Sequence, residues 1–259
     1  MTRLLALVWL ATPAVADVGP LPLADVFVLG EVHDNPGHHA AQAEVVERIA
    51  PTALVFEMVS PEDAARVNDV SDPAALAETL RWAQKGWPDF AMYHPIFTAA
   101  PGARIVGGDT SRDDLMAAMQ RSAADVLGIG RIGFNLWTAG GPGYAALIED
   151  QREAHCGMLP EDLLPGMVEA QRLRDATLAL AARDAVDETG GPVVVITGNG
   201  HARTDTGVPA LLRQLAPELV VWSLGQFEGA VPDEAPFDAT RSSDPVARED
   251  PCAQLRDAG

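Results

Sequence analysis

The sequence predicts an α/β fold with a mostly parallel central sheet that is flanked by helices. Five short apolar runs recur along the chain, with helical segments between them. Continuous runs of valine, isoleucine and leucine are typical of parallel strands that are covered on both faces. With 259 residues, of which 47% are hydrophobic, the chain is long enough to bury a full core.

The expected elements alternate along the chain. The strands are Val26–Gly30, Ala53–Phe56, Arg104–Gly107, Val193–Thr197 and Leu219–Leu224. The helices are His38–Ala50, Pro61–Asn68, Ala74–Gln84, Arg112–Val126, Tyr144–His155, Glu161–Val186 and Pro209–Leu215. The second helix follows a serine cap and has a proline and two acids in its first turn, which favours a helix start. Strand–helix alternation predicts an open sheet with right-handed crossovers.

The first 16 residues predict a secretory signal rather than a part of the fold. Arg3 supplies a positive charge, an apolar run covers residues 4–11, and Ala14-Val15-Ala16 has the small-x-small pattern of a signal peptidase site. We therefore expect a mature chain that begins at Asp17 and is periplasmic or secreted. No cysteine lies near this site and no later segment reaches about 18 apolar residues, so we expect a soluble protein without stable membrane insertion.

The rest of the chain divides into a domain and a tail. We expect a single α/β domain over residues 17–228. Its segment from about 111 to 190 carries several helices and no clear strand, which predicts a helical insertion or cap between the third and fourth strands. Residues 229–259 are acidic and rich in proline, and they predict an irregular C-terminal tail.

The charge of the chain excludes two classes of partner. Lysine and arginine number 18 against 37 acids, which gives a formal net charge of −19. Such a protein repels phosphate backbones and anionic lipid surfaces, so nucleic-acid and peripheral membrane binding are not expected.

Export would place the two cysteines, Cys156 and Cys252, in an oxidising compartment, where a disulfide between them is favoured. Such a bridge would tie the tail to the middle of the chain. The alternatives are two unpaired thiols, or a thiol ligand at Cys156, which follows a histidine.

Acids and imidazoles follow the first, second and fourth expected strands. These candidates are Glu31, His33, Glu57 and His201. Ligands of open α/β sheets bind beyond the carboxyl ends of the strands, so we expect the four side chains to converge. They could bind a divalent metal ion, or serve as catalytic acid and base in a hydrolysis. Helix caps and loop contacts are the alternative roles.

Two further segments add candidates. In the long helix, Gln171, Arg174 and Asp175 form a polar patch at i, i+3 and i+4, which either reaches the site or is a solvated ion pair. The segment from 86 to 95 gathers aromatic side chains beside a histidine, a pattern that is more often core than cofactor pocket.

The motifs LGEVHDNPGHHAAQ (29–42), GWPDFAMYHP (86–95), HCGMLP (155–160), MVEAQRLRDATLA (167–179) and GNGHARTDTGVP (198–209) occur in this order. Together they resemble the ChaN-like haem-binding uptake proteins of the wider Tiki/TraB/erythromycin-esterase-like superfamily. The resemblance covers residues 25–225, and it implies an α/β fold and haem binding linked to iron acquisition. The family also implies export, but this chain lacks the lipobox cysteine of many members.

The resemblance also implies site residues and partners. Haem ligation by tyrosine, aided by histidine, points to Tyr93 with His94 as second choice. Because haem propionates are anionic, we expect Arg152, Arg174 and Arg203 near them. The expected partners are haem, an outer-membrane haem uptake machinery and, in a homodimer, a second copy of the chain.

Two hypotheses of different class follow. The favoured one is an exported haem-binding protein, that is, a binding protein linked to haem and iron acquisition. The alternative is a hydrolase of the same superfamily, either metal-dependent or working by acid and base, with the four strand-end residues as its metal ligands or catalytic groups.

Overall fold

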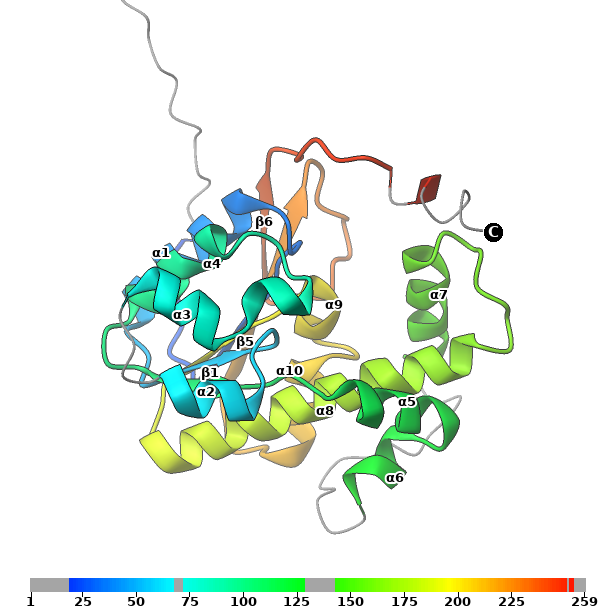
Figure 1. Ribbon diagram of the computed structural model, residues 1–259, viewed down its shortest axis with the longest axis horizontal. Helices are drawn as coiled ribbons and strands as arrows, with labels where there is room; N and C mark the ends of the chain where they lie inside the picture. The colour runs from blue at the N-terminus through cyan, green and yellow to red at the C-terminus, as the bar shows by residue number, and fades with distance from the viewer. Residues whose placement is uncertain (1–18, 68–71, 129–142, 251, 254–259) are drawn as a thin grey trace, which may run out of the picture.

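The computed structural model describes residues 19–67, 72–128, 143–250 and 252–253. A six-stranded sheet lies at the centre, with every pairing parallel and the order β3-β2-β4-β1-β5-β6. The strands are β1 (Val26–Leu29), β2 (Ala53–Phe56), β3 (Arg104–Gly107), β4 (Val193–Ile196), β5 (Val221–Glu228) and β6 (Ala239–Ser243). Helices flank this sheet (Figure 1), which confirms the predicted α/β class.

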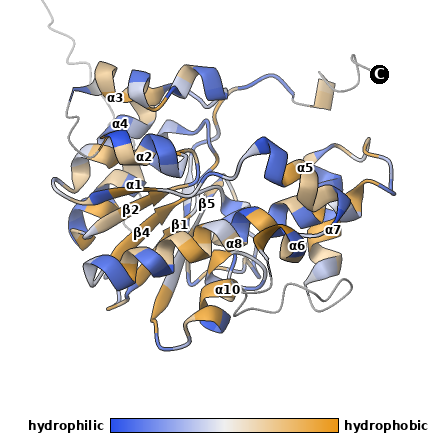
Figure 2. Ribbon diagram, turned by 60° about the horizontal axis from the view of Figure 1, so that its bottom comes forward, coloured by the Kyte–Doolittle hydropathy of each residue, from blue (hydrophilic) through white to orange (hydrophobic). Residues whose placement is uncertain are grey.

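Helices lie on both faces of the sheet. They are α1 (Pro36–Ile49), α2 (Pro61–Val67), α3 (Pro73–Thr79), α4 (Phe90–Ala99), α5 (Arg112–Gln120), α6 (Ala123–Leu127), α7 (Tyr144–Ala154), α8 (Leu164–Thr189), α9 (Asn199–Ala202) and α10 (Val208–Leu215), with a 3-10 helix η1 (Trp82–Lys85). Figure 2 shows α1 to α4 on one side of the strands and α8 and α10 on the other. The sheet therefore has a core on each face.

The apolar runs of the strands supply both cores. Side chains of a strand alternate between its two faces. Val26 and Val28 accordingly join the core against α8 and α10, whereas Phe27 and Leu29 join the core against α1 and α4. All residues of β1, β2 and β4 are buried, as continuous apolar runs predict.

The described part of the segment from 111 to 190 holds the helices α5, α6, α7 and α8 and no strand, in agreement with the predicted insertion. The helix α8 contacts β2, β4 and β3 along the sheet and also contacts α5, α6 and α7. Figure 1 shows α5, α6 and α7 gathered at one end of α8, beyond the sheet. A long helix thus joins the sheet to a smaller helical part.

The structure adds elements that the sequence analysis did not expect. Strand β5 continues to Glu228, and the segment expected to be an irregular tail contributes β6 as a parallel edge strand. The sequence of β6, ATRSS, lacks the apolar pattern of a strand because an edge strand buries little. The helix α4 was also missed: Pro95 lies inside it, although Asp89 caps it and Tyr93, Ile96 and Phe97 supply a buried face.

Cys156 and Cys252 form the expected disulfide. The bridge joins the residues that follow α7 to the C-terminal segment, and Figure 1 shows this segment crossing from β6 toward α7. Arg248 holds the same segment on the sheet through ion pairs with Asp34 and Glu228. In the part of the chain that the structure describes, no helix is both long and apolar enough to cross a membrane.

Removal of the disulfide should destabilise the protein. The bridge closes a loop with a sequence separation of 96 residues, which restricts the unfolded chain. We expect the double variant Cys156→Ser/Cys252→Ser to lose about 2–5 kcal/mol of unfolding free energy in urea denaturation. Thiol counting on denatured, unreduced wild-type protein should find no reactive thiol, and two reactive thiols would show that the bridge is absent.

Candidate functional site

Three parallel strands end at the same edge of the sheet, and the candidate acids and imidazoles meet there. Glu31 and His33 follow β1, Glu57 follows β2, and His201 lies on α9, which follows β4. The structure brings all four together through the contacts described below, and they are called the strand-end site.

The carboxylate of Glu31 is buried and lies at the centre of one half of this site. Its Oε1 accepts hydrogen bonds from the Tyr93 hydroxyl at 2.7 Å and from Nδ1 of His33 at 2.8 Å. Its Oε2 lies 3.4 Å from Nδ1 of the buried His39. Burial alone would raise the pKa of Glu31, but hydrogen bonds from the two imidazoles outweigh it and lower that pKa. Glu31 is therefore an ionised acceptor that links β1, α1 and α4.

His33 is the partly exposed member of the site, with 34% of its side chain accessible. Its pKa is raised, because hydrogen bonding to Glu31 and the nearby carboxylates outweigh the opposite effect of burial. A Cβ at position 198 would lie 3.0 Å from its Nε2, so Gly198 leaves room for the ring. The ring also lies beside Trp87, at 5.0 Å between centroids. Among the described residues, Nε2 of His33 has no hydrogen-bond partner.

Glu57 anchors the other half of the site. Its Oε2 accepts hydrogen bonds from the Thr197 hydroxyl at 2.7 Å and from the Gly198 backbone N–H at 2.8 Å. Its Oε1 lies 3.3 Å from Nε2 of His201 and 3.6 Å from a guanidinium nitrogen of Arg174. Burial would raise the pKa of Glu57, but His201 and the hydrogen bonds lower it well below its usual range.

His201 lies between two buried carboxylates. Its Nδ1 donates to Asp175 at 2.7 Å, and its Nε2 faces Glu57. Burial lowers the pKa of an imidazole, but the two carboxylates outweigh it and raise the pKa of His201 to about 10. Burial raises the pKa of Asp175. At neutral pH His201 therefore holds its proton and is a positive charge shared by two acids.

This pairing limits the chemistry of the strand-end site. An imidazolium that keeps its proton at neutral pH cannot accept one from water, so His201 is a poor general base. Within the described ranges no group of three or more histidine, cysteine, aspartate or glutamate side chains is arranged to hold a metal ion. The arrangement does not favour the predicted hydrolase, and it leaves one accessible ring nitrogen, on His33.

Of the two candidates on α4, Tyr93 lies beside Glu31. Tyr93 is fully buried, and burial together with Glu31 raises the pKa of its phenol. Its hydroxyl is occupied by Glu31 and by the carbonyl of His33. His94 is the next residue of α4, and its ring lies 6.0 Å from that of Phe90. The phenol of Tyr93 thus supports the site from inside rather than facing outward.

The three arginine candidates are not together. Arg174 lies at the strand-end site beside Glu57. Arg152 pairs with Glu149 and Glu161 on the surface near α7. Arg203 pairs with Asp205 and Asp150 in a separate cavity. Of the three, only Arg174 contacts a residue of the strand-end site.

Two contacts of the strand-end site were not assigned from the sequence. His39 follows another histidine at the start of a helix, so its burial against Glu31 had no local signal. For Asp175 the sequence did contain a signal, because it is a polar residue on a core-facing helix face. The structure shows that the polar patch to which it belongs reaches the site.

The stability of the protein should fall as pH rises above neutral. The pKa of His201 is about 10 in the folded protein and about 6.5 in the unfolded chain, so its contribution is full below pH 6.5 and is lost as pH approaches 10. Urea denaturation should show a decrease on the order of 1 kcal/mol per pH unit across this range. The slope should shrink in His201→Gln and persist in the control His155→Gln. Equal slopes in wild type and His201→Gln would contradict the assignment.

Comparisons with known proteins identify the family and the fold of the chain. Residues 18–212 match a protein family described as "Haem-binding uptake, Tiki superfamily, ChaN". No curated protein sequence matches the chain significantly.

Among solved structures, "Cofacial heme binding to ChaN of Campylobacter jejuni" aligns with a TM-score of 0.65 and 18% identity, over 84% of this chain and 86% of that chain. An erythromycin esterase, EreC, aligns with a TM-score of 0.44 and 13% identity, over 90% of this chain and 79% of that chain. The likeness to the Campylobacter jejuni structure establishes the fold. Because the family match covers more than half of the chain, the protein belongs to the ChaN family of haem-binding uptake proteins in the Tiki superfamily.

Proposed function

We propose that the protein binds haem at the strand-end site, with His33 as the ligand of the iron. The observation that carries this proposal is the partly exposed imidazole of His33, whose Nδ1 donates to the buried carboxylate of Glu31. Metal-binding histidines almost always donate their other ring N–H to a carboxylate, a carbonyl or water, which fixes the tautomer. Histidine is also a common axial ligand of haem iron. The site therefore fits the donor that haem requires.

Trp87, which contacts His33, also lines an aromatic groove, and this supports the proposal. Trp87 lies against the His33 ring and also lines a groove of about 430 Å³ together with Trp82 and Phe90. Porphyrin is a large, flat, apolar ring, and such ligands bury their surface against aromatic side chains. Trp87 would thus pack against the macrocycle while His33 holds the iron.

Charge at this site is also compatible with haem. The chain carries a net charge of −19, so anionic propionates need a local excess of cations. Arg174 has 37% of its side chain exposed, and its one ion pair among the described residues is a 3.6 Å contact with Glu57. The buried imidazolium of His201 offsets part of the negative charge of Glu57 and Asp175. Arg174 is therefore the residue that would meet a propionate.

Family membership supports the wider role. The family description names haem-binding uptake, and the Campylobacter jejuni structure is described by cofacial haem binding. We extend the proposal to a carrier in haem and iron acquisition. It would receive haem from an outer-membrane uptake machinery, and a homodimer would place two haems face to face.

Hemin titration tests the ligand assignment. Wild-type protein should give a saturable Soret band of defined stoichiometry. His33→Ala should shift this band and weaken hemin binding at least about tenfold, because the iron loses its imidazole. His155→Ala, which removes an imidazole away from the site, should bind hemin as the wild type does.

Tyr93→Phe separates the two candidate ligands in the same titration. The band should keep its position in this variant, because the phenol is buried against Glu31. A shifted band in Tyr93→Phe together with a normal band in His33→Ala would overturn the assignment to His33.

We also propose that the protein is exported. The basis is the sequence of residues 1–16, which lies outside the described residues, and the disulfide is compatible with an oxidising compartment. Intact-mass measurement of protein from the periplasm or medium should give a chain that begins at Asp17. In the variant Ala14→Arg/Ala16→Arg, processing should fail and the uncleaved chain should accumulate. Wild-type protein that retains Met1 in the cytoplasm would contradict export.

A further inference from the structure

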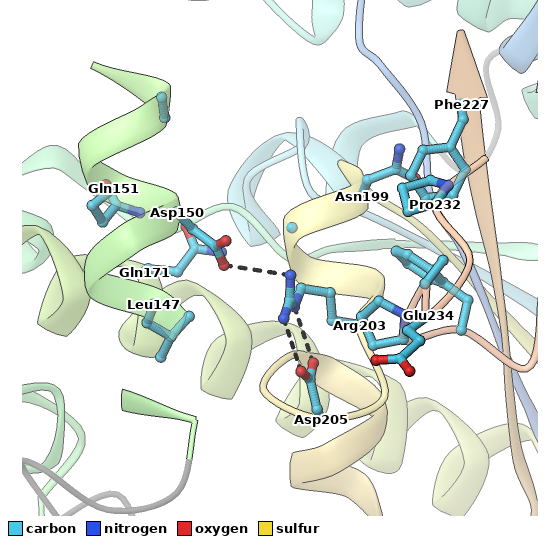
Figure 3. Close-up of a pocket in the computed structure, with 15 residues that line it drawn as sticks. Leu147, Asp150, Gln151, Gln171, Asn199, Arg203, Asp205, Phe227, Pro232 and Glu234 are labelled. Atoms are coloured by element: carbon cyan, nitrogen blue, oxygen red, sulfur yellow. Dashed lines mark hydrogen bonds and ion pairs between the residues drawn. The ribbon is translucent and has the colours of Figure 1, made fainter. Parts of the chain in front are cut away.

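A second cavity lies outside the strand-end site. It measures about 570 Å³ and is lined by α7, by the residues around α9 and by the connection between β5 and β6 (Figure 3). None of the four strand-end residues lines it. Gln171 does, and its side-chain nitrogen lies 3.0 Å from Nδ1 of His201. The cavity is thus a neighbour of the haem site proposed above, and it has its own walls.

Charges on the cavity wall are mostly negative. Asp150, Asp205 and Glu234 line it, against the single cation Arg203. Arg203 makes two hydrogen bonds to Asp205, at 3.0 Å and 2.8 Å, so this pair is bidentate. Because the guanidinium is engaged in this way, it has little capacity left for an anionic ligand.

Two of the carboxylates are left incompletely paired. Asp150 has one contact, at 3.6 Å from Arg203, and Glu234 has no ion pair or hydrogen bond within the described residues. Figure 3 shows Asp150 on α7 and Glu234 on the opposite wall, with Arg203 between them in this view. Burial raises the pKa of Asp150, Arg203 opposes this rise, and the neighbouring acids add to it. A cation that enters the cavity would meet two carboxylates that have few partners of their own.

Much of the remaining wall is apolar, beside the polar side chains of Gln151, Gln171 and Asn199. Phe237 and Phe227 pack edge to face with ring centroids 5.7 Å apart, and both line the cavity. Leu147, Pro232 and Pro236 extend this surface. Flat apolar groups bury their surface against such side chains, and aromatic faces also attract cations.

We propose that this cavity binds a small organic cation, in which a protonated amine is attached to a flat apolar body. Its ammonium group pairs with Asp150, Glu234 adds to the attraction, and the apolar body packs on Phe227 and Phe237. This site is distinct from the haem site and does not depend on the haem proposal.

Calorimetric titration with three indoles of similar size tests the proposal. Tryptamine carries an ammonium group, tryptophol is neutral, and indole-3-propionate is anionic. We expect tryptamine to bind with a Kd on the order of 1 mM or below, and more tightly than the other two. Added salt should weaken tryptamine binding, because the ion pair is partly exposed to solvent.

Two variants of α7 each remove one negative charge, one at the cavity and one outside it. Asp150→Asn should weaken tryptamine binding at least about tenfold, because it removes the partner of the ammonium group. Glu153→Gln is the matched control, since Glu153 is exposed on the same helix and does not line the cavity. An unchanged urea-denaturation midpoint of Asp150→Asn would show that this variant is folded.

The proposal fails under any of three results. In the first, Asp150→Asn and Glu153→Gln bind tryptamine with equal affinity. In the second, indole-3-propionate binds as tightly as tryptamine or more tightly. In the third, no tryptamine binding is detected at about 10 mM. None of them bears on haem binding at His33, so the two proposals can fail separately.

Discussion

Burial of carboxylates at the carboxyl ends of the strands is the constraint on which the rest of the structure depends. An unpaired charge in this position would cost several kcal/mol. Each of the three buried acids lies against an imidazole: Glu31 against His39, and Glu57 and Asp175 against His201. The partners come from different elements, so pairing the acids also holds α1, α8 and α9 against the sheet. The site and the fold therefore share the same contacts.

Much of this architecture could be predicted from the sequence because its causes are local. The strands β1, β2 and β4 are continuous apolar runs, and burial on both faces requires such runs. Parallel pairing then places the ends of these strands at one edge, which is why residues as distant as Glu31 and His201 could be grouped before any coordinates. The disulfide was expected from the number of cysteines and from the predicted export of the chain.

The parts that could not be predicted depend on tertiary contacts. Tyr93 occurs in an aromatic segment, but only the packing of α4 on α1 shows that its phenol turns inward to Glu31. Likewise, β6 has little strand character of its own and is held by pairing with β5. Arg152 and Arg174 have the same chemistry in the sequence, and the structure separates them because Arg152 has two surface glutamates within reach.

The distribution of charge, rather than the total of −19, decides which ligands the chain can accept. At the strand-end site, His201 and Arg174 offset buried carboxylates, which is compatible with the anionic ligand proposed there. In the cavity on the other side of Gln171, acids outnumber the single Arg203, which is already engaged. At moderate ionic strength salt screens charges only beyond about 10 Å, so it does not separate the potentials of two neighbouring sites. One site can then accept an anion and the other a cation only if the carboxylates are paired in the first and unpaired in the second. The proposed haem and amine sites differ in this respect, since Glu57 is fully engaged whereas Asp150 is not.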